Sequence, residues 1–171
     1  MEFKNVSSGK NPPEEINVFV EISKGSSTKY EVDEESGFLM VDRFLYTSMV
    51  FPFNYGFVPN TKAKDGDPLD VVIISSFSVN PGTIIPVRPV GMLQMEDEAG
   101  IDHKIIAVPA EKIDPEQKNI NDIDDVNEHI KDKIKNFFNN YKALEPNKWV
   151  KTKDFLGKKE AQEEIKKSLT K

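Results

Sequence analysis

The residues of this chain best suited to chemistry lie in one acidic turn, where Asp65, Asp67 and Asp70 fall within six residues of one another. Pro68 stiffens the turn, and the apolar run at 71–74 is typical of a strand covered on both faces, which would hold Asp70 at the edge of the core. Crowded carboxylates repel one another unless a cation lies between them, and Mg²⁺ prefers such oxygen ligands. The turn therefore predicts a metal site.

Two other interpretations of the turn were weighed against a magnesium site. A solvated acidic loop is the plainer one, and the buried strand that follows the turn makes it less favourable. A calcium-binding EF-hand loop needs glycine at its sixth position and glutamate at its twelfth. Pro68 and Leu69 occupy the middle of this turn, so the EF-hand interpretation is rejected.

Length and composition restrict the kind of protein that can carry this site. The 171 residues are enough for one domain with a real core, and no internal repeat or linker divides 1–171. The 23 Lys and Arg against 29 Asp and Glu give a net charge of -6, which argues against nucleic acid or an anionic membrane as partner. Cysteine is absent, which excludes disulfides and thiolate metal sites. With no apolar leader or membrane span apparent, we expect a cytoplasmic protein.

The elements that must position the acids are strands first and helices afterwards. Alternating or apolar runs bounded by turn residues predict strands at 17–22, 28–33, 38–44, 71–75, 83–95 and 101–108. The second and third of these form a hairpin closed at 34–37, and Pro86 and Pro89 break 83–95 into an edge or bulged strand. Short, closely connected strands of this number predict a small closed five-stranded barrel of the OB type.

The helical signal comes late in the chain. Apolar residues recur at helical spacing from Ile123 to Leu144, with Asp122 or Asp124 able to cap the start and Pro146 ending the helix. A last helix is expected at 158–169. The predicted class is α+β, with the helices packed outside the barrel.

Charged residues at strand positions connect the acidic turn to distant parts of the chain. Lys29 and Glu31 share one strand face, as do Asp102 and Lys104. Singly, each is more often a salt-bridged or snorkelling surface residue. Together with the turn they form a set of seven acids and four bases: Glu21, Glu31, Asp65, Asp67, Asp70, Asp97 and Asp102 with Lys29, Arg43, Lys104 and Lys142.

The charge of this set indicates its ligand. Alone it sums to -3, since seven acids face four bases, and no anion would enter. Three Mg²⁺ ions would bring the sum to +3 and create a receptor for a compact, highly charged anion. Carboxylates and cationic side chains in one cavity are typical of a metal-bridged phosphate substrate.

These residues stand in blocks that resemble the soluble family I inorganic pyrophosphatases. The family's signature, Asp-small-Asp-Pro-apolar-Asp-apolar, is present from Asp65 to Val71. The resemblance covers most of the chain and extends through these further blocks: Lys29-Tyr30-Glu31, Val41-Asp42-Arg43-Phe44, Pro52-Phe53-Asn54-Tyr55-Gly56, Arg88-Pro89-Val90-Gly91, Asp97-Glu98-Ala99-Gly100, Asp102-His103-Lys104, Phe137-Phe138 and Tyr141-Lys142. The short chain looks like the bacterial form.

The resemblance implies hydrolysis of pyrophosphate to two orthophosphates by direct attack of water, with three or four Mg²⁺ ions and a homohexameric assembly. It implies that Asp67 helps to deprotonate the water. The implied metal ligands are Glu21, Glu31, Asp65, Asp70, Asp97 and Asp102, and the implied substrate-binding residues are Lys29, Arg43, Tyr55, Lys104, Tyr141 and Lys142. One departure is Phe51, where the family often has tyrosine.

Two questions stay open at the level of sequence. Tyr141 falls on the apolar stripe of the helix, so its spacing alone predicts a core aromatic; its ring can pack while its hydroxyl reaches a phosphate. A non-catalytic barrel that binds nucleic acid or a partner protein is the rival function, because small five-stranded barrels often do so. The net charge and the lack of an aromatic and basic stripe argue against that rival.

Overall fold

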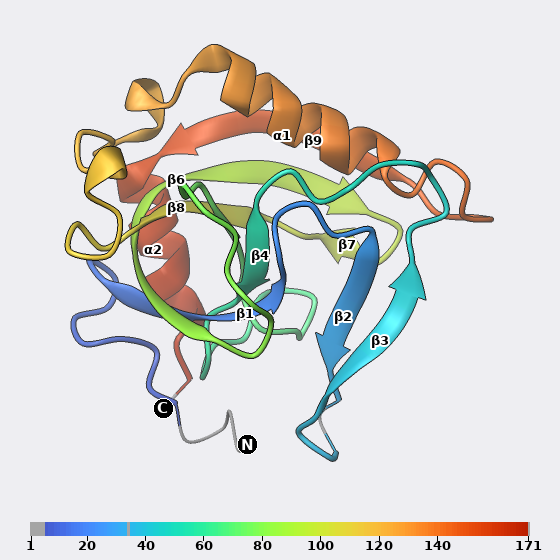
Figure 1. Cartoon of the computed structure of the whole chain (residues 1–171), viewed down its shortest axis with the longest axis horizontal. Coiled ribbons are helices and arrows are strands. Elements are labelled where there is room, and N and C mark those ends of the chain that lie inside the picture. Colours follow the sequence, from blue (N-terminus) through green and yellow to red (C-terminus); the bar gives the residue numbers. More distant parts are fainter. Residues whose placement is uncertain (1–5, 34, 171) are drawn as a thin grey trace.

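The computed structural model describes residues 6–33 and 35–170, and at its centre five strands close into a ring (Figure 1). The ring runs β1 (Ile16–Ile22), β4 (Asn54–Phe57), β5 (Asp70–Ile73), β8 (Lys104–Pro109) and β6 (Ile84–Asp97), and β6 pairs back with β1. Only β5 and β8 are parallel within the ring. The predicted small OB-like barrel is confirmed.

The long strand β6 corrects the prediction made for its prolines. It continues through Pro86 and Pro89 and pairs with β1, β8, β9 (Val150–Gly157) and the short β7 (Gly100–Ile101), so it is not an edge strand. The predicted bulge is present, because the register against β8 shifts between Pro89 and Gly91. A bulge lets a strand absorb a residue that cannot donate to the ladder.

Two strands were not expected from the sequence. β4 reads Asn-Tyr-Gly-Phe, with no β-branched residue, and β9 carries lysines at alternate positions near its start. In β4 the position of Gly56 is decided by packing: a Cβ there would lie 1.9 Å from the carbonyl oxygen of Phe19 on β1. The close approach of the β1 and β4 backbones therefore requires glycine at this position.

The helices lie outside the ring, as predicted, but the first is shorter than its apolar stripe. Asp122 caps a 3₁₀ turn, η3 (Ile123–Asp125), while α1 (Glu128–Asn140) begins separately after the cap Asn127 and ends before Pro146. A second 3₁₀ turn, η2, spans Pro115–Gln117. The last helix, α2 (Lys158–Ser168), matches the expected 158–169. No helix of the described residues is long and apolar enough to cross a membrane.

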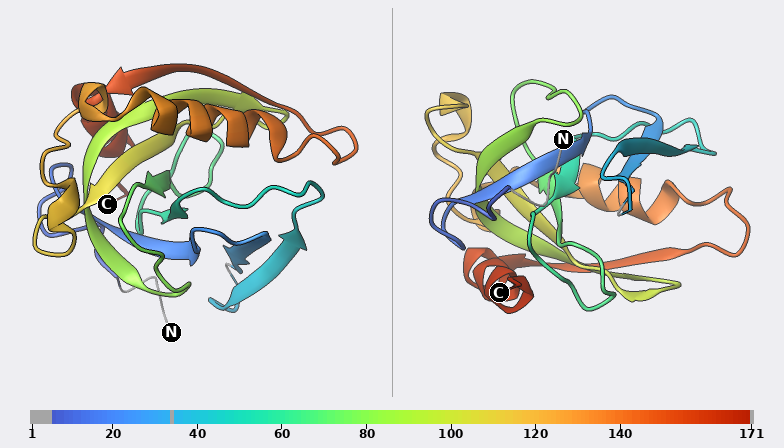
Figure 2. Two further views of the ribbon diagram at one scale, coloured as in Figure 1. Left: turned by 45° about the horizontal axis from the view of Figure 1, so that its top comes forward. Right: turned by 90° about the horizontal axis from the view of Figure 1, so that it is seen from below.

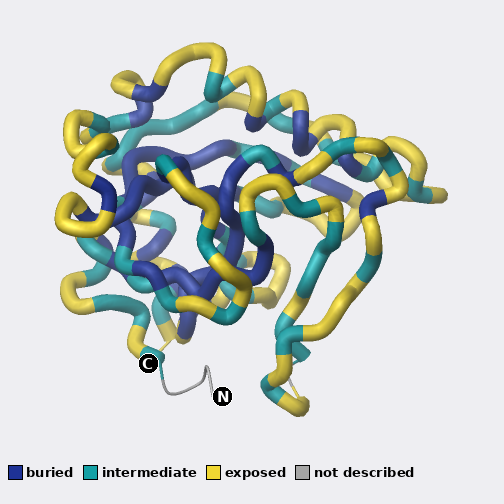
Figure 3. The backbone as a smooth tube through the Cα atoms, viewed as in Figure 1, coloured by how far each residue is buried: buried dark blue, intermediate teal, exposed yellow. Residues whose placement is uncertain are grey.

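The hairpin predicted at 28–44 is present but stands apart from the barrel. Its strands β2 (Thr28–Val32) and β3 (Leu39–Phe44) form a separate two-stranded antiparallel sheet that projects beside the ring (Figure 2). Glu34, in its closing turn, and residues 1–5 at the N-terminus lie outside the described residues. Figure 3 shows the ring strands mostly buried and the hairpin half-buried or exposed.

Candidate active site

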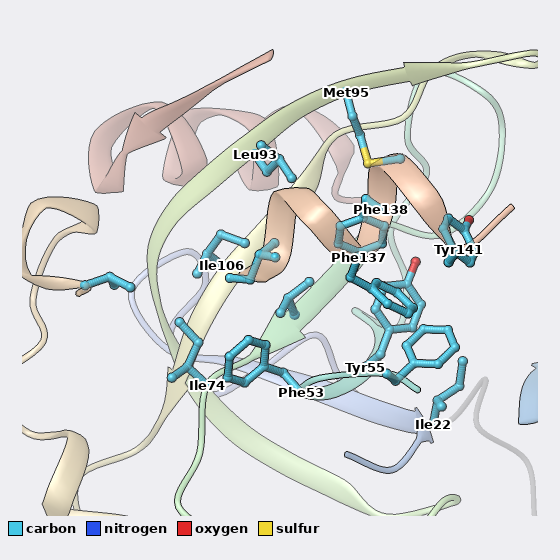
Figure 4. Close-up of a cluster of buried hydrophobic side chains, with 14 of the residues drawn as sticks. Ile22, Phe53, Tyr55, Ile74, Leu93, Met95, Ile106, Phe137, Phe138 and Tyr141 are labelled. Carbon is cyan, nitrogen blue, oxygen red and sulfur yellow. The ribbon is translucent and has the colours of Figure 1, made fainter. Parts of the chain in front are cut away.

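Strand alternation places charged residues at the margin of an apolar core. Val72 on β5 and Ile106 on β8 belong to the buried cluster that packs against α1 (Figure 4). Asp70 and Lys104 lie two residues before them and share their strand faces. Because β5 and β8 are parallel and these two residues begin their strands, both side chains emerge at the same end of the ring. The core therefore ends in an ion pair at this margin.

Lys104 is the centre of one group of charges, which it forms with Asp70 and Asp102. Its Nζ lies 2.5 Å from Asp70 Oδ2, 2.5 Å from Asp102 Oδ1 and 5.7 Å from the centre of the Tyr55 ring, and its side chain is 3% exposed. Burial alone would lower the pKa of the ammonium, but the two carboxylates outweigh it and raise that pKa. Burial and the charge of Asp70 raise the pKa of the Asp102 carboxyl, and together they outweigh the lowering effect of Lys104.

A cavity of about 530 Å³ opens between this group and the hairpin. Its lining is Glu21, Lys29, Tyr30, Glu31, Val32, Tyr55, Phe57, Asp67, Pro68 and Asp70. Glu21 accepts a hydrogen bond from the amide of Val32 at 3.1 Å, yet burial and the nearby charge of Asp70 raise the pKa of its carboxyl to about 8. The lining carries four acidic residues and one lysine, so acids outnumber bases in the cavity.

The hairpin carries a second group of charges, of which Lys29 and Glu31 line the cavity and Asp42 and Arg43 do not. Lys29 contacts Glu31 on its own strand, which confirms that these two share a face, and lies 3.3 Å from Asp42 on β3. Arg43 pairs with Asp42 and donates from Nε to Glu145 Oε1 at 2.9 Å. Burial acts to lower the pKa of the Arg43 guanidinium, but the two carboxylates more than offset it and raise that pKa.

A third group lies where α1 ends. Tyr141 is buried among the aromatic rings of the core, and Lys142 Nζ lies 2.9 Å from Asp97 Oδ2 and 3.6 Å from Glu98 Oε1. Lys148 contacts the same Glu98 carboxylate at 2.5 Å. Burial opposes ionisation of Glu98, but these lysines lower its pKa to about 2. Burial is the main cause that raises the pKa of the Tyr141 phenol.

The three carboxylates of the acidic turn differ in where they lie relative to the cavity. Asp67 lines the cavity, whereas Asp65 does not, and both are exposed. Asp65 Oδ1 accepts a hydrogen bond from the amide of Asp67 at 3.1 Å, so it also serves to shape the turn. Of the three carboxylates that first indicated a metal site, only Asp70 is fixed by the strand ladder, through its pairing with Phe57.

The predicted metal ligands do not form a finished coordination sphere. Among the described residues, no three His, Cys, Asp or Glu side chains gather closely enough to hold a metal ion. Lysine ammonium groups instead lie on the carboxylates: Lys104 on Asp70 and Asp102, and Lys142 on Asp97. An ammonium held between two carboxylates marks a place that favours a cation, and the all-oxygen donors are those that hard divalent ions take. The donor set therefore fits Mg²⁺.

Sequence reasoning missed Asp42 and Glu145. Strand alternation puts Asp42 on the face opposite Arg43, yet its carboxylate reaches both Lys29 and Arg43. Glu145 pairs with a residue 102 positions away, a separation at which spacing carries no signal. The only available hint was its place close after Tyr141-Lys142.

Comparison with known proteins gives consistent matches over nearly the whole chain. The family model described as inorganic pyrophosphatase matches residues 18–171. The inorganic pyrophosphatase of Aquifex pyrophilus is 53% identical over 169 residues, which cover 99% of this chain and 96% of that protein. That of Saccharolobus solfataricus is 56% identical over 161 residues, covering 94% of each. The crystal structure of inorganic pyrophosphatase from Thermus thermophilus superimposes with a TM-score of 0.95 at 42% identity and covers 99% of this chain and 97% of that one.

Proposed function

This chain belongs to the inorganic pyrophosphatase family, and we propose how its residues carry out that family's reaction. The protein hydrolyses inorganic pyrophosphate to two orthophosphates. The observation that carries the assignment of the site is the cavity of about 530 Å³, which has carboxylates and lysine around it in one enclosure. Such a mixture suits a polyanion that arrives with divalent cations.

The cofactor is a set of divalent ions, and we propose three to four Mg²⁺. The carboxylates that would hold them are Glu21, Glu31, Asp65, Asp70, Asp97 and Asp102, in agreement with the oxygen-only donor set and with the lysine ammonium groups that lie on several of them. Such ions, when bound, lower the pKa of water and shield the charge of phosphoryl oxygens.

The side chains of the protein perform the remaining steps. Lys29, Arg43 and Lys104 reach the site from the hairpin and from β8, and Tyr141 and Lys142 reach it from the end of α1. These five groups hold the two phosphates, and Tyr55 closes the wall beside Lys104. Asp67, exposed and on the cavity wall, takes the proton of the attacking water. Water attacks directly, so no covalent phosphoenzyme forms.

A nucleic-acid-binding barrel remains the alternative from another class. Strands of single-stranded nucleic acid bind to basic grooves with aromatic platforms. The cavity instead has Glu21, Glu31, Asp67 and Asp70 on its wall, and the chain carries a net charge of -6. These charges favour the hydrolase.

The setting of the enzyme completes the proposal. Residues 1–171 act as one domain in the cytoplasm, and the chain assembles as a homohexamer. Support for assembly comes from large apolar side chains left exposed on the surface, among them Phe38, Phe44 and Phe77.

Phosphate release from pyrophosphate, measured with Mg²⁺, without divalent ions and with Ca²⁺ alone, tests the proposal. We expect turnover with Mg²⁺ only, and inhibition when Ca²⁺ is added. Mg²⁺ takes six oxygens at about 2.0–2.1 Å, whereas Ca²⁺ takes six to eight at about 2.3–2.6 Å and would disturb the placement of water. Full turnover with Ca²⁺ alone would contradict the proposed cofactor. Tight single-strand binding without turnover would favour the rival barrel.

A further inference from the structure

The carboxylate of Glu145 connects the hairpin to the loop that follows α1. It lies in the loop between α1 and β9, and its side chain is 8% exposed. The backbone around it is held in a turn, because its amide donates to Lys142 O at 2.9 Å and its carbonyl accepts from the amide of Lys148 at 3.3 Å. Its Oε1 accepts from Arg43 Nε at 2.9 Å. A nearly buried carboxylate thus holds an arginine of the hairpin.

The two carboxylate partners of Arg43 determine how its guanidinium is oriented. A guanidinium is planar and carries five N–H donors in a fixed fork. Glu145 takes the Nε–H, Asp42 takes a donor of Nη1, and these are the hydrogen bonds that Arg43 makes with the described residues. Two contacts on different nitrogens fix the plane of the group and leave donors of both Nη atoms for phosphate oxygens.

The hairpin needs such an anchor because it has little packing of its own. No described residue of β2 or β3 is buried, and the two strands form a sheet separate from the barrel. An arginine on a strand of this kind has many accessible orientations, and ordering a long side chain costs conformational entropy. Glu145 reaches Arg43 from the α1–β9 loop, so this loop supplies the anchor.

We propose that Glu145 is a positioning residue for pyrophosphate, which aligns the Arg43 guanidinium so that its free edge meets a phosphate. The proposal rests on the role assigned above to Arg43 as a substrate-binding residue. It also explains the charges of the loop: Lys142 and Lys148 turn toward Asp97 and Glu98, whereas Glu145 turns toward the hairpin. The segment that follows α1 therefore places Lys142 beside Asp97 and, through Glu145, also contacts Arg43 on the hairpin.

Steady-state kinetics of Glu145→Gln, Arg43→Lys and the double variant, at saturating Mg²⁺, test the proposal. Glutamine keeps the shape and can still accept one hydrogen bond, but it lacks the charge. For Glu145→Gln we expect KM for pyrophosphate to rise at least about tenfold, with kcat within about twofold of the parent. A misaligned guanidinium loses a charged hydrogen bond to phosphate, and the weakest such bonds correspond to about this ratio. Arg43→Lys should raise KM as well. Adding Glu145→Gln to it should change KM by less than about twofold, because the lysine variant has no guanidinium for Glu145 to align.

Glu128→Gln is the matched control, because it makes the same substitution at an ion pair of α1 whose glutamate side chain is 81% exposed and does not line the cavity. We expect no change in KM. Thermal unfolding of each variant separates loss of fold from loss of alignment. If Glu145→Gln fails to fold, Glu145→Asp, which keeps the charge on a shorter stem, gives the same comparison and a smaller rise in KM.

The outcomes distinguish this inference from the proposed function beneath it. If Arg43→Lys raises KM while Glu145→Gln does not, the positioning role is overturned and the role of Arg43 stands. If the two effects on KM multiply in the double variant, Glu145 acts by a route other than Arg43 and the inference is wrong. If Arg43→Lys leaves KM unchanged, the substrate role of Arg43 is wrong, and the inference falls with it.

Discussion

On the barrel side of the site every residue of β4 and β8 is buried, whereas on the hairpin side no residue of β2 or β3 is. Lys104 therefore has a buried strand beneath it as well as ion pairs to Asp70 and Asp102, while Arg43, on an unburied hairpin, relies more on its ion pairs to Asp42 and Glu145. The comparison shows two ways of fixing a cation in one site. Both cations lie on paired strands and both have carboxylate partners, but only Lys104 lies on a strand that is buried throughout.

The largest effect is expected in the acidic turn, where a strand residue and a turn residue lie three positions apart. Asp70→Asn removes charge beside Lys104 at the start of β5 and should weaken binding of divalent ions. Asp67→Asn should leave that binding near normal and lower turnover by about 10²–10⁴-fold, the contribution of a positioned general base. Calorimetric metal titration of both variants, with turnover at saturating Mg²⁺, separates the roles. Equal loss of metal affinity would make Asp67 a ligand.

A lysine exchange on each side tests the comparison directly through stability. Lys104→Met leaves Asp70 and Asp102 without their shared cation in a buried setting, which should lower the free energy of unfolding by about 3–5 kcal/mol. Lys29→Met breaks pairs at the partly exposed Glu31 and Asp42 and should change it by no more than about 1 kcal/mol. Urea unfolding in the presence of a chelator measures both. Similar losses would mean that the hairpin is as firmly built as the barrel.

A backbone contact of the barrel can be tested at Gly56. A Cβ at this position would lie 1.9 Å from the carbonyl oxygen of Phe19, so β1 and β4 would have to separate. We expect Gly56→Ala to lower the free energy of unfolding by at least about 1–3 kcal/mol, the usual cost of overpacking. The strand also carries Tyr55 toward the cavity, so KM should change with stability. An unchanged melting temperature would show that β1 and β4 can move apart at this point without loss of stability.

The smallest effect is expected at Phe51, where the family often has tyrosine. The ring is 3% exposed, and its centroid lies 4.7 Å from that of Phe137 and 5.5 Å from that of Tyr55. Phe51→Tyr adds one hydroxyl, whose net hydrogen bond is worth about 0.5–1.5 kcal/mol, and any gain in pyrophosphate binding should stay within that range. Loss of the fold on this change would indicate a pocket packed tightly around the apolar ring.

Local patterns in the sequence predicted much of the scaffold. The last helix, the 28–44 hairpin and the five-stranded ring agree with the structure, because side-chain periodicity and turn residues report on each element separately. Local pattern did not predict β4, a four-residue strand that contains Asn54 and Gly56, or the start of α1, where the apolar stripe ran through a separate 3₁₀ turn. The central place of β6 was missed, since the prolines pointed to an edge strand.

What the sequence determined by itself about the site is which residues carry charge and which neighbours share a strand face, as Lys29 with Glu31 shows. Asp102 also contacts Lys104, but it lies between β7 and β8 and not in a strand, so the strand predicted at 101–108 is interrupted there. Only the tertiary structure decided that Lys104 lies between Asp70 and Asp102 and that Arg43 meets Glu145. The physical reason is range. Alternation along a strand is a property of successive residues, whereas contacts across the site depend on closure of the ring, which brings distant segments together. Burying a charge is costly unless it is paired, and for Lys104 one of the partners, Asp70, comes from a distant segment.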